Sequence, residues 1–219
     1  MPFRRFVREG FSFPGKPAII DWSLRKFSAQ WQFFWKEGAS IDFEFVILDT
    51  IAKLHNEFLD TFLPIITSFG NAGIGWIVLS LLLLCIPKYR KAGLSMALAL
   101  LFCLLIGNLT LKPLVARMRP YSYFPDMTLL VPPQKDFSFP SGHTFASFAA
   151  ATALFLHHKK EGAAAYILAV VIAFSRLYLY VHFPSDVLAG LILGIASGWT
   201  AYKLVDWYQQ KYRPKWLLS

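Results

Sequence analysis

The chain has 219 residues, of which 56% are hydrophobic and only 16% are charged, and its mean hydropathy is +0.46. This balance excludes a soluble globule and indicates one domain that crosses a membrane several times. The net charge of +9 is not a sign of nucleic-acid binding, because most lysines and arginines lie in short clusters between apolar segments, where they face lipid headgroups or set the topology.

Residues 1–40 alternate basic and aromatic side chains and contain no apolar run long enough to cross a bilayer. This mixture is typical of an interfacial segment, with aromatic rings in the headgroup zone and cations on lipid phosphates. A partly disordered tail is the alternative. We therefore divide the chain into this segment, an all-α membrane domain over 41–208 and a cytoplasmic tail over 209–219.

Six segments of the membrane domain are predicted to be transmembrane helices of one bundle. The first, 43–66, has apolar residues at helical spacing but also charged ones, so a re-entrant or surface helix is its alternative. The other five are more uniformly apolar, and the twenty uncharged residues of 92–111 are enough to cross about 30 Å of hydrocarbon. These five are 72–87, 92–111, 143–157, 162–181 and 187–205.

The last of these segments repeats a small residue every fourth position, at Gly190, Gly194 and Gly198. This spacing favours close packing against another helix. An even number of crossings puts both termini on one side of the membrane, and most of the 22 lysines and arginines then lie on that side. The positive-inside rule makes it the cytoplasmic side of a cell membrane. Three polar sequences, described next, then all lie at the outer ends of the helices.

The first polar sequence runs from Lys112 to Pro120 and contains Arg119, seven residues after the lysine. Seven residues make about two helical turns, so both cations would face one direction if this stretch were helical. Pro120 would then end the helix. A pair of cations that anchors a helix end by snorkelling is the alternative.

The second polar sequence, Pro140-Ser141-Gly142-His143, opens the segment 143–157. The start of a helix has free N–H groups and a positive dipole end, which suit an anion. Ser141 can cap the helix, and Gly142 lets the backbone approach a phosphate oxygen closely. His143 lies in the first turn, where it can reach a leaving-group oxygen. A plain helix cap would also explain this sequence.

The third polar sequence contains Ser175-Arg176, His182 and Asp186. The carboxylate of Asp186 follows His182 by four residues, a spacing that can place it against the imidazole. Such a contact would fix the tautomer of the ring and leave its other nitrogen free to attack phosphorus. In the alternative reading, Asp186 only caps a helix and His182 is an interfacial ring.

Taken in order, the three sequences resemble the signature of the type-2 phosphatidic acid phosphatase superfamily, over residues from about 43 to 206. The resemblance implies that His182 is the nucleophile that forms a phosphohistidine and that Asp186 orients it. It implies that His143 protonates the leaving oxygen and then activates water. The clamp that it implies for the phosphoryl oxygens consists of Lys112, Arg119, Ser141, Gly142 and Arg176.

Protein cations replace the usual Mg²⁺ in this interpretation, and the sequence contains no P-loop or acidic metal cluster, so we expect no metal and no cofactor. The substrate should be a lipid phosphate that enters laterally from the bilayer, with the connector 121–139 forming part of the entrance. In the family, compact members act on undecaprenyl diphosphate, phosphatidylglycerophosphate or phosphatidate, and we favour the first.

Two other classes of protein share some of these features. A vanadate-dependent haloperoxidase has a similar anion pocket, although those relatives are soluble. A non-catalytic lipid-phosphate binding or transport protein would also hold charges within a membrane. Release of phosphate from a lipid substrate distinguishes the enzyme from both classes. The sequence predicts no nucleic-acid partner and leaves the oligomeric state open.

Overall fold

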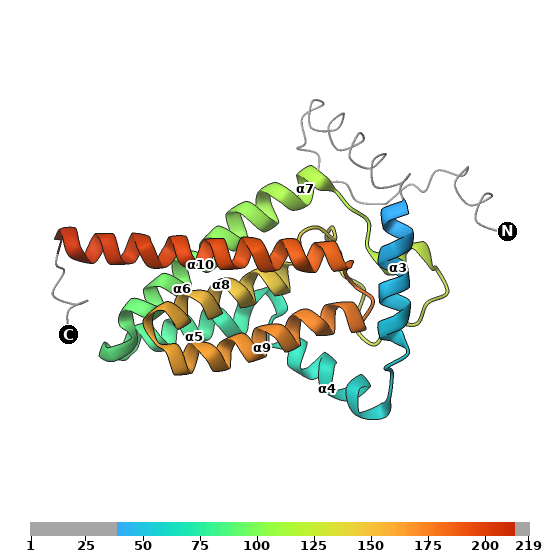
Figure 1. Ribbon diagram of the computed structural model, residues 1–219, viewed down its shortest axis with the longest axis horizontal. Coiled ribbons are helices and arrows are strands. Elements are labelled where there is room, and N and C mark those ends of the chain that lie inside the picture. The colour runs from blue at the N-terminus through green and yellow to red at the C-terminus, as the bar shows by residue number, and fades with distance from the viewer. Residues whose placement is uncertain (1–38, 213–219) are drawn as a thin grey trace.

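The computed structural model describes residues 39–212, and within this range all regular structure is helical (Figure 1). The centre of the bundle is α8 (Gly142–His157), which packs against α6 (Arg90–Phe102), α9 (Lys159–Tyr178) and α10 (Pro184–Tyr212). Small alanine and serine side chains fill α8 and are buried on most of its faces. The predicted all-α architecture is confirmed.

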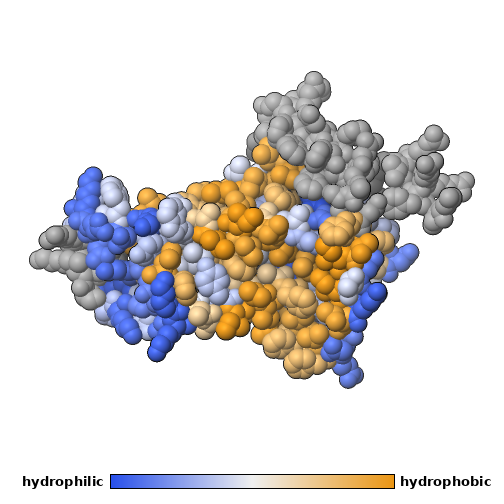
Figure 2. All heavy atoms as spheres, in the orientation of Figure 1, coloured by the Kyte–Doolittle hydropathy of each residue, from blue (hydrophilic) through white to orange (hydrophobic). Residues whose placement is uncertain are grey.

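Four helical stretches within residues 39–212 are long and apolar enough to cross a membrane, in place of the six that we predicted from the sequence. Figure 2 shows a broad apolar belt over the middle of the molecule, with a hydrophilic end where α10 finishes. Helix α8 is shorter, at 16 residues, and lies inside the bundle. The four stretches are Glu57–Cys85, Pro87–Tyr123, Lys159–Tyr178 and Pro184–Tyr212.

The predicted first span over 43–66 is wrong, because the chain breaks in its middle. Helix α3 (Ala39–Ala52) ends there, and α4 (Glu57–Ser68) begins behind an Asn56 cap whose side chain accepts a hydrogen bond from the backbone N–H of Leu59. Helix α4 then continues through a short turn into α5 (Ile74–Cys85). The stretch from α4 to α5 is therefore one candidate span, whereas the sequence analysis divided these residues between two spans, 43–66 and 72–87.

Helix α3 lies across the end of the bundle where α9 finishes and α10 starts (Figure 1). The hydroxyl of Tyr180 donates to Asp49 at 2.8 Å, so a charge that interrupts the apolar pattern of 43–66 is satisfied at this end of the bundle. The predicted interfacial segment 1–40 lies outside the described residues, apart from the first two residues of α3.

The glycines of α10 face α8. A Cβ at Gly190 would lie 2.7 Å from the carbonyl oxygen of Ser141, and one at Gly198 would lie 2.6 Å from that of Ala149. A Cβ at Gly194 would meet the Phe148 side chain at 2.7 Å. Real side chains do not approach so closely, so the predicted role of these glycines in helix packing is confirmed.

The remaining elements connect the spans. Helix α6 continues into the wider π-type helix η3 (Cys103–Leu111) and then into a single turn, α7 (Lys112–Val115). A connector leads from the short helix η4 (Pro120–Tyr123) to the start of α8. At the far end, α10 extends to Tyr212, so the predicted start of a tail at residue 209 falls within a helix.

Candidate active site

Lys112 and Arg119 converge by a route that the sequence did not predict. Helix α7 ends after one turn at Ala116, whose backbone is left-handed with φ 48°, and the chain reverses there. The stretch from 112 to 119 is therefore not one continuous helix, the condition under which the two cations would have faced one direction. The two cations nevertheless reach the same carboxylate: Nζ of Lys112 pairs with one oxygen of Asp136, and Nη2 of Arg119 lies 2.6 Å from the other.

The guanidinium of Arg119 joins the first polar sequence to the third. Its Nε donates to the carbonyl oxygen of Asp136 at 3.0 Å, and its Nη2 donates to that of Phe137 at 3.3 Å as well as to the Asp136 carboxylate. Its Nη1 donates to the carbonyl oxygen of Val181 at 2.8 Å and to Nε2 of His182 at 3.1 Å. All five donors of this side chain are thus in use.

His182 is held in one tautomer and in its neutral form. A guanidinium can only donate, so Nε2 of His182 accepts from Arg119 and the proton lies on Nδ1. Nδ1 faces the hydroxyl of Ser138 at 3.4 Å and the carboxylate of Asp186 at 3.6 Å. Burial, with the nearby charges of Arg119 and Arg176, lowers the pKa of His182 well below its usual value of 6.5. The lone pair on Nε2 therefore points into the clamp.

We predicted that Asp186 contacts His182. Its carboxylate lies 3.6 Å from Nδ1 of the ring, which is longer than a hydrogen bond, and it binds several other groups. The oxygen that faces His182 accepts from the Ser138 hydroxyl and, at 2.9 Å, from the backbone N–H of Phe183. The second contact resembles half of a capping box at the start of α10. The other oxygen accepts from Nη1 of Arg117 at 2.7 Å. Asp186 thus orders the helix start, and the hydroxyl of Ser138 lies between it and the ring of His182.

Arg117 and Glu44 are buried site residues that the sequence analysis missed. Nη2 of Arg117 pairs with Glu44, and Nη1 donates to the hydroxyl of Ser185 at 2.6 Å. The other carboxylate oxygen of Glu44 accepts from the backbone N–H of Ser185 at 2.9 Å. The nearest signal in the sequence was a second arginine two residues before Arg119, but its direction depends on the chain reversal at Ala116.

The second polar sequence lies against both of the others. The backbone N–H of Ser141 donates to the carbonyl oxygen of Asp186 at 3.0 Å, and its hydroxyl shares a 3.0 Å hydrogen bond with that of Thr144. A Cβ on Gly142 would lie 3.4 Å from Nζ of Lys112. The start of α8 therefore faces the lysine of the clamp, with its Ser141 cap confirmed.

His143 is oriented by a residue of the turn between α4 and α5. Its Nε2 lies 2.9 Å from Oδ1 of Asn71, and a Cβ on Gly70 would come within 2.8 Å of the imidazole. The sequence showed this Gly-Asn pair only as a turn. The next residue, Ala72, has a left-handed backbone with φ 50°. Strain of this kind is common at functional sites, and Ala116 and Tyr180 show it in the turns that carry Arg119 and His182.

Arg176 is the cation of the site with unused donors. Its side chain is only 1% exposed, and Nη1 donates to the hydroxyl of Thr67 at 2.8 Å. Its Nε and Nη2 are buried and have no hydrogen-bond partner. Buried N–H donors without partners are costly, so Nε and Nη2 of Arg176 could bind an anion here. Within residues 39–212, no group of three or more histidine, cysteine or acidic side chains is arranged to hold a metal ion.

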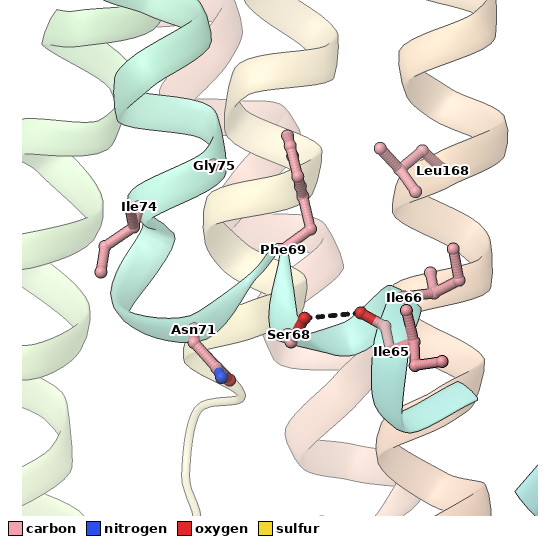
Figure 3. A pocket seen from close by; sticks show the side chains of 8 residues that line it. All are labelled: Ile65, Ile66, Ser68, Phe69, Asn71, Ile74, Gly75 and Leu168. Carbon is pink, nitrogen blue, oxygen red and sulfur yellow. Dashed lines mark hydrogen bonds between the residues drawn. The ribbon is translucent and has the colours of Figure 1, made fainter. Parts of the chain in front are cut away.

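A pocket of about 700 Å³ opens on the flank of the bundle, between the α4–α5 turn and α9 (Figure 3). Apolar side chains line most of it, including Phe69, Ile74 and Leu168, and Asn71 lies at its edge. Because Asn71 also binds His143, the pocket adjoins the site.

The connector 121–139, which we expected to form part of a substrate entrance, does not line this pocket. Tyr121 and Val131 pack against a cluster around Tyr178, and Tyr123 packs against the cluster around Phe183. These side chains pack against the bundle, and none of them lines the pocket.

The family model of the PAP2 superfamily matches residues 88–210. An undecaprenyl-diphosphatase of Sulfolobus acidocaldarius is 32% identical over 137 residues, which cover 62% of this chain and 66% of that protein, just under two thirds of its length. Undecaprenyl-diphosphatase BcrC of Bacillus subtilis is 30% identical over 156 residues, covering 69% of this chain and 78% of that protein. The crystal structure of a PAP2-type phosphatidylglycerolphosphate phosphatase from Bacillus subtilis is similar with a TM-score of 0.61 and 28% identity, over 87% of this chain and 96% of that one.

Proposed function

The chain belongs to the PAP2 superfamily, and we propose that it is a membrane lipid phosphatase that works through a phosphohistidine. One observation carries the proposal: Arg119, which together with Lys112 holds an anion, the carboxylate of Asp136, also donates to the lone pair on Nε2 of His182. The unused donors of Arg176 add capacity for further anionic oxygens. A phosphoryl group in the place of the carboxylate would meet both the clamp and the nucleophile.

In the proposed reaction, Nε2 of His182 attacks phosphorus, and the bond from phosphorus to the leaving oxygen breaks. His143 protonates that oxygen. His143 then takes a proton from water, whose oxygen attacks the phosphohistidine, and the phosphorus–nitrogen bond breaks to release orthophosphate. The clamp, namely Lys112, Arg119, Arg176, Ser141 and the N–H of Gly142, stabilises the negative charge on the equatorial oxygens.

The substrate that we propose is undecaprenyl diphosphate, which gives undecaprenyl phosphate and phosphate. The names of the two diphosphatase relatives support it. Phosphatidylglycerophosphate is the second candidate, because the crystal-structure relative acts on it by name, and phosphatidate is the third. Phosphate release by the purified protein in detergent, measured for each of the three lipids, tests the choice. No release from any of them would favour a non-catalytic binding or transport protein.

The chemistry of the intermediate has its own test. His182→Ala should abolish turnover, and acid-labile, base-stable radioactive phosphate should label the native protein but not this variant during turnover. Robust activity in His182→Ala would refute the nucleophile. Because we propose that three side-chain cations supply the positive charge, activity should survive EDTA. Loss that Mg²⁺ restores would contradict a metal-free reaction.

We further propose that the site faces the outside of the cell and that the lipid enters laterally, through the pocket of Figure 3. The opposite end of the bundle has basic clusters at 88–91 and 159–160, which the positive-inside rule places in the cytoplasm together with the end of α10. A single cysteine in the connector 121–135, with Cys85 and Cys103 replaced by serine, should react with an impermeant reagent in intact cells. Reaction only after lysis would overturn this orientation.

A further inference from the structure

A line of buried charges leads from α3 to the nucleophile. Glu44, Arg117 and Asp186 are 7%, 2% and 0% exposed, so all three charges lie in the interior. Arg117 lies between the two carboxylates and pairs with both. The guanidinium also lies 4.0 Å over the ring of Phe183, next to His182 in the chain.

We propose that Arg117 and Glu44 are positioning residues for the hydrolysis, which act on His182 through Asp186. This inference rests on the proposed function. Arg117 binds the Asp186 oxygen that points away from His182, and the other oxygen faces Nδ1 of the ring. The planar guanidinium binds Glu44 through Nη2 and Asp186 through Nη1, so its fixed fork holds the two carboxylates in one arrangement. Fixing Asp186 in this way keeps the proton of His182 on Nδ1 and the lone pair on Nε2.

Glu44 determines the net charge of the group formed by Glu44, Arg117 and Asp186. One guanidinium between two carboxylates leaves a net negative charge behind the ring, opposite the cations of the clamp. This charge makes the imidazole a better base and nucleophile than Arg117 with Asp186 alone would. Glu44 is on α3, outside the residues 88–210 that match the family model, so the family motifs do not include it.

The two residues should therefore move the pH dependence in opposite directions. Removal of the Glu44 charge makes the surroundings of His182 more positive, which extends activity to lower pH. Removal of the Arg117 charge makes them more negative, so that the ring is protonated and inactive at a higher pH. The other charged or titratable groups around His182, which stay unchanged, are Lys112, Arg119, Asp136, His143, Arg176 and Asp186.

The experiment compares kcat/KM for undecaprenyl diphosphate across pH in detergent micelles. In Glu44→Gln, the acid limb should move down by roughly half a pH unit, and in Arg117→Gln it should move up by about one. Since Arg117→Gln leaves two buried carboxylates without a cation, the double variant Glu44→Gln/Arg117→Gln provides a second comparison. Its acid limb should lie about one pH unit above that of Glu44→Gln.

Arg117→Lys keeps the charge but loses the fork. We expect its acid limb to stay at the native position while kcat falls about tenfold or more and KM changes little, because Asp186 is no longer held in one orientation. Glu161→Gln is the matched control, since this carboxylate accepts a hydrogen bond from Tyr89 at the opposite end of the bundle, and its profile should be native.

Unmoved acid limbs, with kcat reduced only in proportion to the folded fraction, would overturn the inference and leave Arg117 and Glu44 with a purely structural role. If the variants behaved in this way but the native protein released phosphate from a lipid, the proposed function would still be supported. A native protein that releases no phosphate from any lipid would refute the proposed function and this inference with it.

Discussion

Nη1 of Arg119 donates to Nε2 of His182 at 3.1 Å, so the proposed clamp and the proposed nucleophile are in direct contact. The contact selects the Nδ1–H tautomer and keeps the attacking lone pair directed at the place where phosphorus must bind. In the proposed mechanism, a bound phosphoryl group takes over this donor of Arg119 and thereby frees the lone pair. Anion binding and activation of the nucleophile are thus one event in the proposed mechanism.

Asp136 competes with phosphate for the clamp. Burial raises the pKa of Asp136, but Lys112 and Arg119 outweigh this effect and lower it to about 2, so the carboxylate is charged at every working pH. Asp136→Asn removes this competing charge. We expect the inhibition constant of orthophosphate to fall about three- to tenfold, a modest effect because the Asp136 side chain is 48% exposed.

Asp126→Asn is the control for this measurement, because Asp126 is an exposed acid of the same connector. It should leave the inhibition constant unchanged. If phosphate bound Asp136→Asn no better than the native protein, the carboxylate would not occupy the phosphate position.

The lowered pKa of His182 predicts a loss of stability in acid. The unfolded chain binds a proton at His182 below about pH 6.5, whereas the folded protein keeps the ring neutral well below that pH. The unfolded state therefore gains protons first, and acidification from pH 7.5 to 5 lowers the free energy of unfolding. Asp136 adds nothing in this window, because its pKa lies below it.

Thermal unfolding in detergent at these two pH values checks this prediction. His182→Gln should lose fewer degrees of Tm on acidification than the native protein does. An equal loss in both proteins would show that the imidazole is not held neutral.

Substitutions at two glycines of α10 should distinguish an effect on helix packing from an effect on catalysis. A Cβ at Gly190 or at Gly198 would press equally hard on the backbone of α8, but Gly190 meets Ser141 at the site and Gly198 meets Ala149 farther along. Both Gly→Ala changes should lower the stability by about 1–3 kcal/mol. Only Gly190→Ala should also lower kcat of the folded protein, by about tenfold or more, because the start of α8 shifts. Tm and phosphate release measure the two effects, and equal kcat values would contradict the assignment of this helix start to the clamp.

If the pocket holds the lipid tail, filling it should raise KM only for substrates that have a long tail. Leu168→Trp fills the pocket, so KM for undecaprenyl diphosphate should rise about tenfold, while turnover of isopentenyl diphosphate, which lacks a long tail, should stay native. The neighbouring Ile167 is 68% exposed and does not line the pocket, so Ile167→Trp is the matched control. Equal effects of Leu168→Trp on both substrates would place the tail elsewhere.

The sequence alone was enough to predict features that depend on residues close together in the chain. Hydropathy predicted an all-α membrane protein, since a helix satisfies its backbone within one segment. The start of α8 at Pro-Ser-Gly-His and the packing role of the α10 glycines were also predicted, because both depend on residues that are close in sequence. The order of the three polar sequences led to the family, because the residue types at these spacings are specific to its chemistry.

Only the tertiary structure decided which groups the chain brings together, because their partners are far apart in sequence. Asn71 and His143 are 72 residues apart, and Glu44 and Arg117 are 73 apart. Two of the charges that disturbed the pattern of 43–66 lie on either side of the break between α3 and α4, where Tyr180 donates to Asp49 and Tyr178 donates to Asp60. The reversal at Ala116 likewise sends Arg117 to Asp186 and Arg119 to His182, and a left-handed alanine has no local signal, since the surrounding packing imposes it.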